Sequence, residues 1–110
     1  ALMSSGMNGQ NFSFNGYLKI EKKQRAKDLK KFEQLAIRKN QTQIFIETPY
    51  RSYTFFLDAI KALNNNTRFC IACDLSRDSE YIKTQTVLEW KKNKPNLYKR
   101  PCIFIIEGGD

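Results

Sequence analysis

Three carboxylates stand directly after apolar runs that are typical of buried strands. Glu47 ends "QIFIE", Asp74 follows "RFCIAC" and Glu107 ends "CIFIIE". In open α/β sheets, ligands bind in the crevice beyond the carboxyl ends of the strands. If the three strands lie side by side and parallel, their acids line one edge and can receive a small ligand such as a ribose or an amine. The alternative is structural, since strands commonly end in polar residues.

A strongly basic segment lies upstream of the first of these strands. The chain has a formal net charge of +8, and residues 21–40 hold eight lysines and arginines against three acids. Such a face suits a polyanionic partner, nucleic acid above all, through salt-dependent and sequence-independent contacts with phosphates. We expect Lys23, Arg25 and Lys30 to contact the substrate. A solvated outer face of a helix is the alternative.

Two aromatic residues lie among basic residues near the end of the chain. Trp90 and Tyr98 are interspersed with lysines in "WKKNKPNLYKR". Aromatic rings beside Lys and Arg can stack unpaired bases, so Trp90 and Tyr98 join the candidate substrate-binding residues. The alternative is that both rings close the edge of the core.

The composition limits other chemistries. The chain contains no His, which excludes acid–base or triad catalysis by histidine. Cys70 and Cys73 have the spacing of a zinc half-site, but only Cys102 remains to join them, so four ligands require carboxylates and no metal site is predicted. We expect three buried, reduced thiols and a cytoplasmic, reducing location.

The elements that must position these residues alternate along the chain. The residue patterns predict helices at 21–40, after Thr48 and after Thr86, and strands at 11–20 (with a bulge or tight turn at Gly16), 41–47, 68–73, 81–86 and 102–107. Thr48 is expected as an N-cap with Pro49 as the first helical residue, and Thr86 with Glu89 matches a capping box. The 110 residues therefore predict an α/β (α+β) fold, a single layered domain with a mixed five-stranded sheet flanked by helices.

Taken in order, these segments resemble a known family. They read "ALMSSGMNGQNFSFNGYL", a Lys/Arg-rich helix, "IFIETPYR", "RFCIACDLS", "EYIKTQTVLEW" and "IFIIEGG". The ordered set resembles the S-adenosylmethionine-dependent methyltransferases with the tetrapyrrole-methylase fold, and within them the branch of ribosomal RNA small-subunit methyltransferase I. The resemblance covers nearly the whole chain.

The resemblance implies a domain architecture. Residues 1–110 would be the C-terminal domain of a two-domain enzyme, with a glycine-rich N-terminal domain absent. The opening "ALMSSG" agrees with this, because it lacks an initiator Met and is typical of a helix end with a Gly stop. The implied partners are small-subunit ribosomal RNA and a second copy of the chain, with no membrane. The fragment alone is expected to be inactive.

The resemblance also implies site residues, whereas the catalytic residues stay unassigned. S-adenosylmethionine would bind in the cleft between the two domains. Arg51, retained from the family motif, is expected to hold a substrate phosphate or the acids at the strand ends. The residues expected at the cofactor are Phe45, Ile46, Glu47, Asp74, Leu75, Ile106, Glu107 and Gly108.

Three positions depart from the family pattern, one of them Asp74, which stands where the family commonly has Glu. Tyr50 stands where the ribosomal branch often has His, and Lys19 where the family usually has Pro. Tyr50 puts in doubt that the same nucleotide is modified. Two alternatives stay open: a methyltransferase for a tetrapyrrole or another small molecule, whose acidic side chains the basic charge would bind, and a non-catalytic basic RNA-binding module.

Overall fold

A five-stranded sheet with helices packed on it forms the structure, a computed structural model that describes residues 12–16, 22–74, 78–97 and 99–107. The elements in chain order are β1 (Phe12–Gly16), α2 (Lys22–Lys39), β2 (Thr42–Glu47), α3 (Ser52–Ala62), β3 (Arg68–Cys73), β4 (Tyr81–Thr86), α4 (Val87–Lys92) and β5 (Cys102–Ile106). The helix end expected at "ALMSSG" lies outside the described residues.

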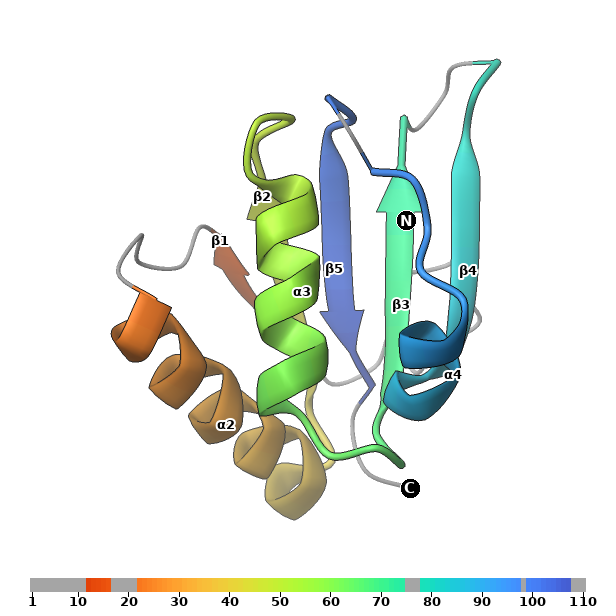
Figure 1. Cartoon of the computed structure of the whole chain (residues 1–110). Helices are drawn as coiled ribbons and strands as arrows, with labels where there is room; N and C mark the ends of the chain where they lie inside the picture. The colour runs from red at the N-terminus through yellow and green to blue at the C-terminus, as the bar shows by residue number, and fades with distance from the viewer. Residues whose placement is uncertain (1–11, 17–21, 75–77, 98, 108–110) are drawn as a thin grey trace.

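The strands are ordered β1-β2-β5-β3-β4 across the sheet. β1 pairs with β2 in parallel, whereas the β2–β5, β5–β3 and β3–β4 pairs are antiparallel. The mixed five-stranded sheet is therefore confirmed. One consequence decides the site: β2 and β3 run in the same direction, and β5 runs between them in the opposite direction (Figure 1).

The described helices α2, α3 and α4 lie on one face of the sheet (Figure 1). Alternation along the strands directs Phe45, Phe69 and Phe104 toward them, where these rings are fully buried in the main core. The apolar stripe of α2 contributes Leu29 and Ala36 to the same core. The opposite face carries a smaller cluster of Ile44, Cys70 and Ile105, with Ile82 and Ile103 packed against it.

Two local predictions are confirmed. The β1–β2 register shifts between Phe14 and Gly16, and Gly16 has a φ of +66°, a left-handed conformation that glycine adopts at little cost. The capping box of α4 is present in full, because Thr86 and Glu89 each bind the backbone amide of the other.

The predicted start of the third helix is wrong by a few residues. Thr48 is not its N-cap, since α3 begins at Ser52 with Arg51 at the cap position. Residues 48–51 form a turn first, in which the Arg51 amide donates to the Thr48 carbonyl at 3.1 Å. The physical reason is that the Thr48 carbonyl closes this turn and its amide donates to the Glu47 carboxylate, so Thr48 is held before the helix and does not cap it.

Candidate functional site

One edge of the sheet gathers the ends of β2 and β3 with the beginning of β5, and we name it the strand-end edge. Glu47 pairs with Cys102, and Cys73 pairs with the same residue from the other side. Asp74 follows at once, and its amide donates to the carbonyl of Pro101 at 3.3 Å. Two of the three predicted acids, Glu47 and Asp74, are thus brought to one edge.

The third acid lies at the opposite edge, which corrects the expectation of a shared border. The Glu107 amide donates to the carbonyl of Arg68, the first residue of β3, and its carboxylate lies 3.0 Å from the Arg68 guanidinium. Ile106 pairs with Phe69 and Gln43 near the beginnings of β3 and β2. The reason is the direction of β5: an antiparallel strand between two parallel ones must end where its neighbours begin.

Glu47 is a buried carboxylate at the strand-end edge. It is 4% exposed, although it ends its strand. Its Oε1 accepts a hydrogen bond from the Thr48 amide at 2.8 Å, and the Arg51 Nε lies 3.9 Å from the same atom. The Arg51 side chain is 40% exposed, so the guanidinium faces both the carboxylate and solvent. Glu47 and Arg51 therefore form a charged pair beside the first turn of α3.

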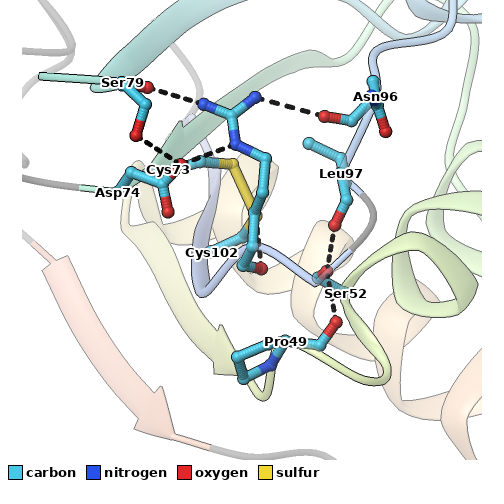
Figure 2. A network of polar contacts seen from close by, with 9 residues as sticks. Pro49, Ser52, Cys73, Asp74, Ser79, Asn96, Leu97 and Cys102 are labelled. Atoms are coloured by element: carbon cyan, nitrogen blue, oxygen red, sulfur yellow. Dashed lines mark hydrogen bonds and ion pairs between the residues drawn. A yellow bond between two sulfur atoms is a disulfide. The ribbon is translucent and has the colours of Figure 1, made fainter. Parts of the chain in front are cut away.

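Asp74 is held by an ion pair with Arg100 and by a hydrogen bond from Ser79. Figure 2 shows Asp74 and Ser79 in this network. The Asp74 Oδ2 accepts from Arg100 Nε at 2.7 Å and from Ser79 Oγ at 3.1 Å. The other guanidinium nitrogens of Arg100 donate to the carbonyls of Ser79 and Asn96. Asp74 has a φ of +52°, a left-handed conformation that Asp tolerates better than most residues. Its Oδ2 is thus committed to holding the loop before β5 against the β3–β4 connection.

The loop before β5 is also tied to the start of α3. The Ser52 hydroxyl is buried and donates to the carbonyl of Leu97 at 2.9 Å (Figure 2). Arg100 lies over the Tyr81 ring, 5.7 Å from its centroid. Burial raises the pKa of Tyr81, while the Arg100 charge acts to lower it and Cys70 to raise it. These contacts connect α3, the loop and β4 around the strand-end edge.

A disulfide between Cys73 and Cys102 crosses this edge, so the expectation of three reduced thiols is wrong for two of them. The two residues are direct partners in the antiparallel β3–β5 pair, with 4.4 Å between their Cα atoms. Such a short spacing is typical of the non-hydrogen-bonded position, where side chains stand closest. Cys70 is buried and takes no part in this disulfide. Sequence spacing highlighted Cys70 and Cys73, but only strand pairing shows that Cys102 is the partner.

The other residues predicted at the cofactor are distributed unevenly. The Phe45 ring lies in the core against Phe32 and Phe55, so only its backbone can face a ligand. Ile46 is half-buried and precedes Glu47 at the strand-end edge. Leu75 and Gly108 lie outside the described residues.

Two of the predicted substrate-binding residues are core residues. Trp90 is 1% exposed and its indole N–H donates to the Phe69 carbonyl at 2.8 Å, so it offers no face for stacking a base. Arg25 is 4% exposed and forms an ion pair with Asp58 between α2 and α3. Both predictions are corrected, because tertiary packing buries side chains that sequence alone places beside exposed lysines. Lys23 and Lys30 are exposed as expected, and Tyr98 lies outside the described residues.

Arg100 and Ser52 are site residues that sequence reasoning missed. Arg100 resembled the other basic residues of its segment, and its acid lies 26 residues away in the chain. Ser52 and its acceptor are separated by 45 residues. The only local signal was Pro101, which restricts the conformation of Arg100 before it.

Two structural features bear on the class of protein. Within the described residues, no group of three or more His, Cys, Asp or Glu is placed to hold a metal ion. In the same part of the chain, no helix has both the length and the apolar character needed to cross a membrane.

Comparison with known proteins gives the geometry a family context. No family model matches the chain. It is 34% identical, over 99% of its length, to the ribosomal RNA small subunit methyltransferase I of Buchnera aphidicola subsp. Schizaphis graminum. The chain is related to ribosomal RNA small subunit methyltransferase I. The Buchnera aphidicola subsp. Acyrthosiphon pisum protein of the same name is 30% identical over 98% of the chain.

The chain spans 38% of the length of both of these relatives. A solved structure, that of the methyltransferase CobJ, shares the fold with a TM-score of 0.60, at 12% identity, over 98% of this chain and 46% of its own. The resemblance inferred from the ordered motifs is thereby confirmed. The strand-end edge, with Glu47, Asp74 and the loop that Arg100 holds, thus lies within the sequence that is similar to these relatives.

Proposed function

We propose that the chain is the C-terminal domain of an S-adenosylmethionine-dependent methyltransferase that acts on small-subunit ribosomal RNA. The observation that carries this proposal is the similarity to ribosomal RNA small subunit methyltransferase I over 99% of the chain. The basic surface of α2 supports an RNA substrate, because the exposed Lys23 and Lys30 suit phosphate contacts.

Part of a cofactor site fits the strand-end edge. A ligand carrying hydroxyl and ammonium groups needs hydrogen-bond acceptors, and Glu47 supplies a buried carboxylate at the strand-end edge. The backbone of Ile46 and the Arg51 guanidinium lie beside it. Ile106 and Glu107 do not fit, because β5 places them at the far edge. The bound cofactor would supply the transferable methyl group, and this chain would hold and orient it.

In this proposal the residues of the strand-end edge contribute to catalysis by orienting the cofactor and the substrate. Fixing two reactants in a productive geometry can supply a large share of a rate enhancement. In this proposal Glu47 is a binding residue and Asp74 a positioning residue, since Arg100 and Ser79 hold its Oδ2. Arg51 steadies Glu47 or receives a substrate phosphate. The proposal assigns the cofactor only partly to this chain, so the chain alone should bind S-adenosylmethionine weakly and be inactive.

The proposal extends to location and assembly. A cytoplasmic site of action follows from a ribosomal RNA substrate, and a homodimer is carried over from the family resemblance. In a reducing cytoplasm the Cys73–Cys102 pair would stand as two thiols. Light scattering on the complete encoded protein measures its oligomeric state. A monomer at micromolar concentration would contradict the proposed homodimer.

A methyl-transfer assay tests the function. The complete encoded protein is given labelled S-adenosylmethionine with either small ribosomal subunits or a tetrapyrrole precursor. We expect label in the RNA. Label only in the tetrapyrrole would replace the RNA proposal by the small-molecule one, and tight RNA binding without any label would favour a non-catalytic module.

Two matched variants test the site within the same assay. Glu47→Gln removes a charged acceptor at the strand-end edge and should weaken cofactor binding by about 10- to 100-fold, corresponding to about 1.5–3 kcal/mol for a hydrogen bond to a charged group. Glu107→Gln makes the same chemical change at the opposite edge and should leave cofactor affinity nearly unchanged. Equal losses in the two variants would contradict the placement of the site.

A further inference from the structure

A line of lysines runs along the outer face of α2. Lys23, Lys27 and Lys30 are spaced by four and three residues, which places them on the same side of a helix. All three are exposed. From Lys23 to Lys30 the helix rises about 10 Å, at roughly 1.5 Å per residue.

A groove lies between this helix and α3. It has a volume of about 170 Å³ and is lined by Ala26, Lys30, Asp58, Lys61 and Ala62. Lys30 comes from α2 and Lys61 from α3, so an amine borders the groove on each side. The short side chains of the two alanines leave the space between these lysines open. We name this site the α2–α3 groove.

The groove is electrostatically positive despite its one acid. Asp58 is buried and forms an ion pair with the buried Arg25 from α2, which compensates its charge. The Arg25 Nε is buried without a hydrogen-bond partner in the described structure. The same ion pair links the two helices that form the walls. Because the Arg25–Asp58 pair is neutral overall, Lys30 and Lys61 give the groove two further positive charges.

The lysines of the groove are available to a ligand. Among the described residues, no salt bridge joins Lys23, Lys27, Lys30 or Lys61 to an acid. Amines held near one another without counter-ions repel, and an anion between them relieves this repulsion. A phosphodiester has the charge and the acceptor oxygens to do so.

We propose that the α2–α3 groove binds a phosphate of the RNA backbone between Lys30 and Lys61, and that Lys27 and Lys23 continue the contact along α2. This inference rests on the proposed RNA substrate and adds where the RNA lies. The groove is lined from the second half of α3, whose eleven residues span about 16 Å from the strand-end edge where the helix begins. RNA held in the groove therefore leaves the strand-end edge free for the cofactor and the target nucleotide.

A binding experiment without cofactor tests the groove. The affinity of the complete encoded protein for a small-subunit ribosomal RNA fragment is measured over a range of salt concentrations. The double variant Lys30→Gln/Lys61→Gln should bind at least about tenfold more weakly at low salt, and its salt slope should fall by about 2, roughly 1 for each lost phosphate contact. Both side chains are exposed, and thermal unfolding checks that the fold is retained.

The matched control removes the same charge elsewhere. Lys92→Gln/Lys94→Gln changes two exposed lysines at the end of α4 and beyond it. Because charges farther apart than about 10 Å are largely screened at moderate salt, this variant should lose less than about threefold in affinity. Equal losses in the two double variants would overturn the groove and leave only a diffuse effect of net charge.

The outcomes separate this inference from the proposed function. Methyl transfer to RNA with unchanged binding by the Lys30/Lys61 variant would reject the groove and keep the function. Groove-dependent RNA binding without methyl transfer would keep the groove and reject the function. A DNA strand of the same sequence serves as a second ligand, and tighter groove-dependent binding of DNA would overturn the assignment to RNA.

Discussion

At the scale of single residues, the clearest finding is that basic side chains from similarly Lys/Arg-rich segments have different roles. Arg25 is buried against Asp58, Arg100 holds Asp74, and Lys30 is exposed on a groove. A planar guanidinium can satisfy several acceptors at once, which suits Arg to buried pairs, while Lys is a hydrated point charge suited to exposed ones. In these cases the two arginines form ion pairs with buried acids, and Lys30 stays exposed to solvent.

Arg100 provides a prediction at this scale. Arg100→Ala removes a charged hydrogen bond from the buried Asp74 and two more from loop carbonyls, so we expect a loss of about 2 kcal/mol in the free energy of unfolding. The pKa of Tyr81 should rise further, because the Arg100 charge acts to lower it. Urea unfolding and titration of the phenol measure the two effects. Arg100→Lys keeps the charge but loses the planar guanidinium, so its free energy of unfolding should lie between those of the unaltered protein and Arg100→Ala. If Arg100→Ala were as stable as the unaltered protein, the proposed role of Arg100 would be contradicted.

At the scale of elements, local sequence signals determine where chains turn and helices begin. Gly16 marks the irregular β1–β2 register, and the capping box starts α4 directly at the end of β4. Such signals act within a few residues, so they hold in any tertiary context that leaves them exposed. α4 has only six residues, which makes its cap a large part of its stability.

The capping box gives a prediction with a pH dependence. Thr86→Ala removes the acceptor for the Glu89 amide and should cost about 1 kcal/mol at neutral pH, measured by thermal or urea unfolding. The hydrogen bond from the Thr86 amide lowers the pKa of Glu89 below its ordinary value of 4.5. A carboxylate whose pKa is lowered by folding stabilises the protein above its unfolded pKa, and this contribution is lost as the pH falls through the folded pKa.

The capping box should therefore weaken below the ordinary pKa of Glu89. The Thr86 hydroxyl also donates to the Glu89 carboxylate and lowers its pKa. Thr86→Ala lacks this bond, so the difference in stability between the protein and the variant should shrink between neutral pH and about pH 3. Thr86→Ser keeps the hydroxyl and serves as the control, with most of the stability retained. A difference that stays constant across this pH range would show that the bond from the Thr86 hydroxyl to the Glu89 carboxylate does not contribute.

At the scale of the whole molecule, strand direction determines which of the acidic residues can share a site. The ends of β2 and β3 meet at one edge because both run the same way, and β5 sends Glu107 to the other edge. The strand-end edge lies beside the start of α3 (Figure 1). The α2–α3 groove is lined by residues from the second half of the same helix. The fold thus offers a place for a small ligand and a separate place for a polyanion.

The disulfide provides a prediction at the same scale. Cys73 and Cys102 are separated by 29 residues, and closing a loop of this length stabilises a folded chain by about 3–4 kcal/mol in the chain-entropy account. A reductant should therefore lower the urea midpoint, while the strand pairing keeps the fold. Cys70→Ala should respond to the reductant as the unaltered protein does, since Cys70 takes no part in the disulfide. An unchanged midpoint would show that the disulfide does not form in solution.

The sequence by itself determined most of the elements, the mixed sheet, the exposed lysines of α2 and the resemblance to ribosomal RNA small subunit methyltransferase I, because these depend on local periodicity, capping and ordered motifs. Only the tertiary structure decided that Glu107 lies away from Glu47, that Trp90 is a core residue, and that Cys73 meets Cys102. The physical reason is that strand order and direction are set by contacts between distant segments. Spacing along the chain records which residues end a strand, but the pairing of β5 between β2 and β3 determines which of those ends share an edge.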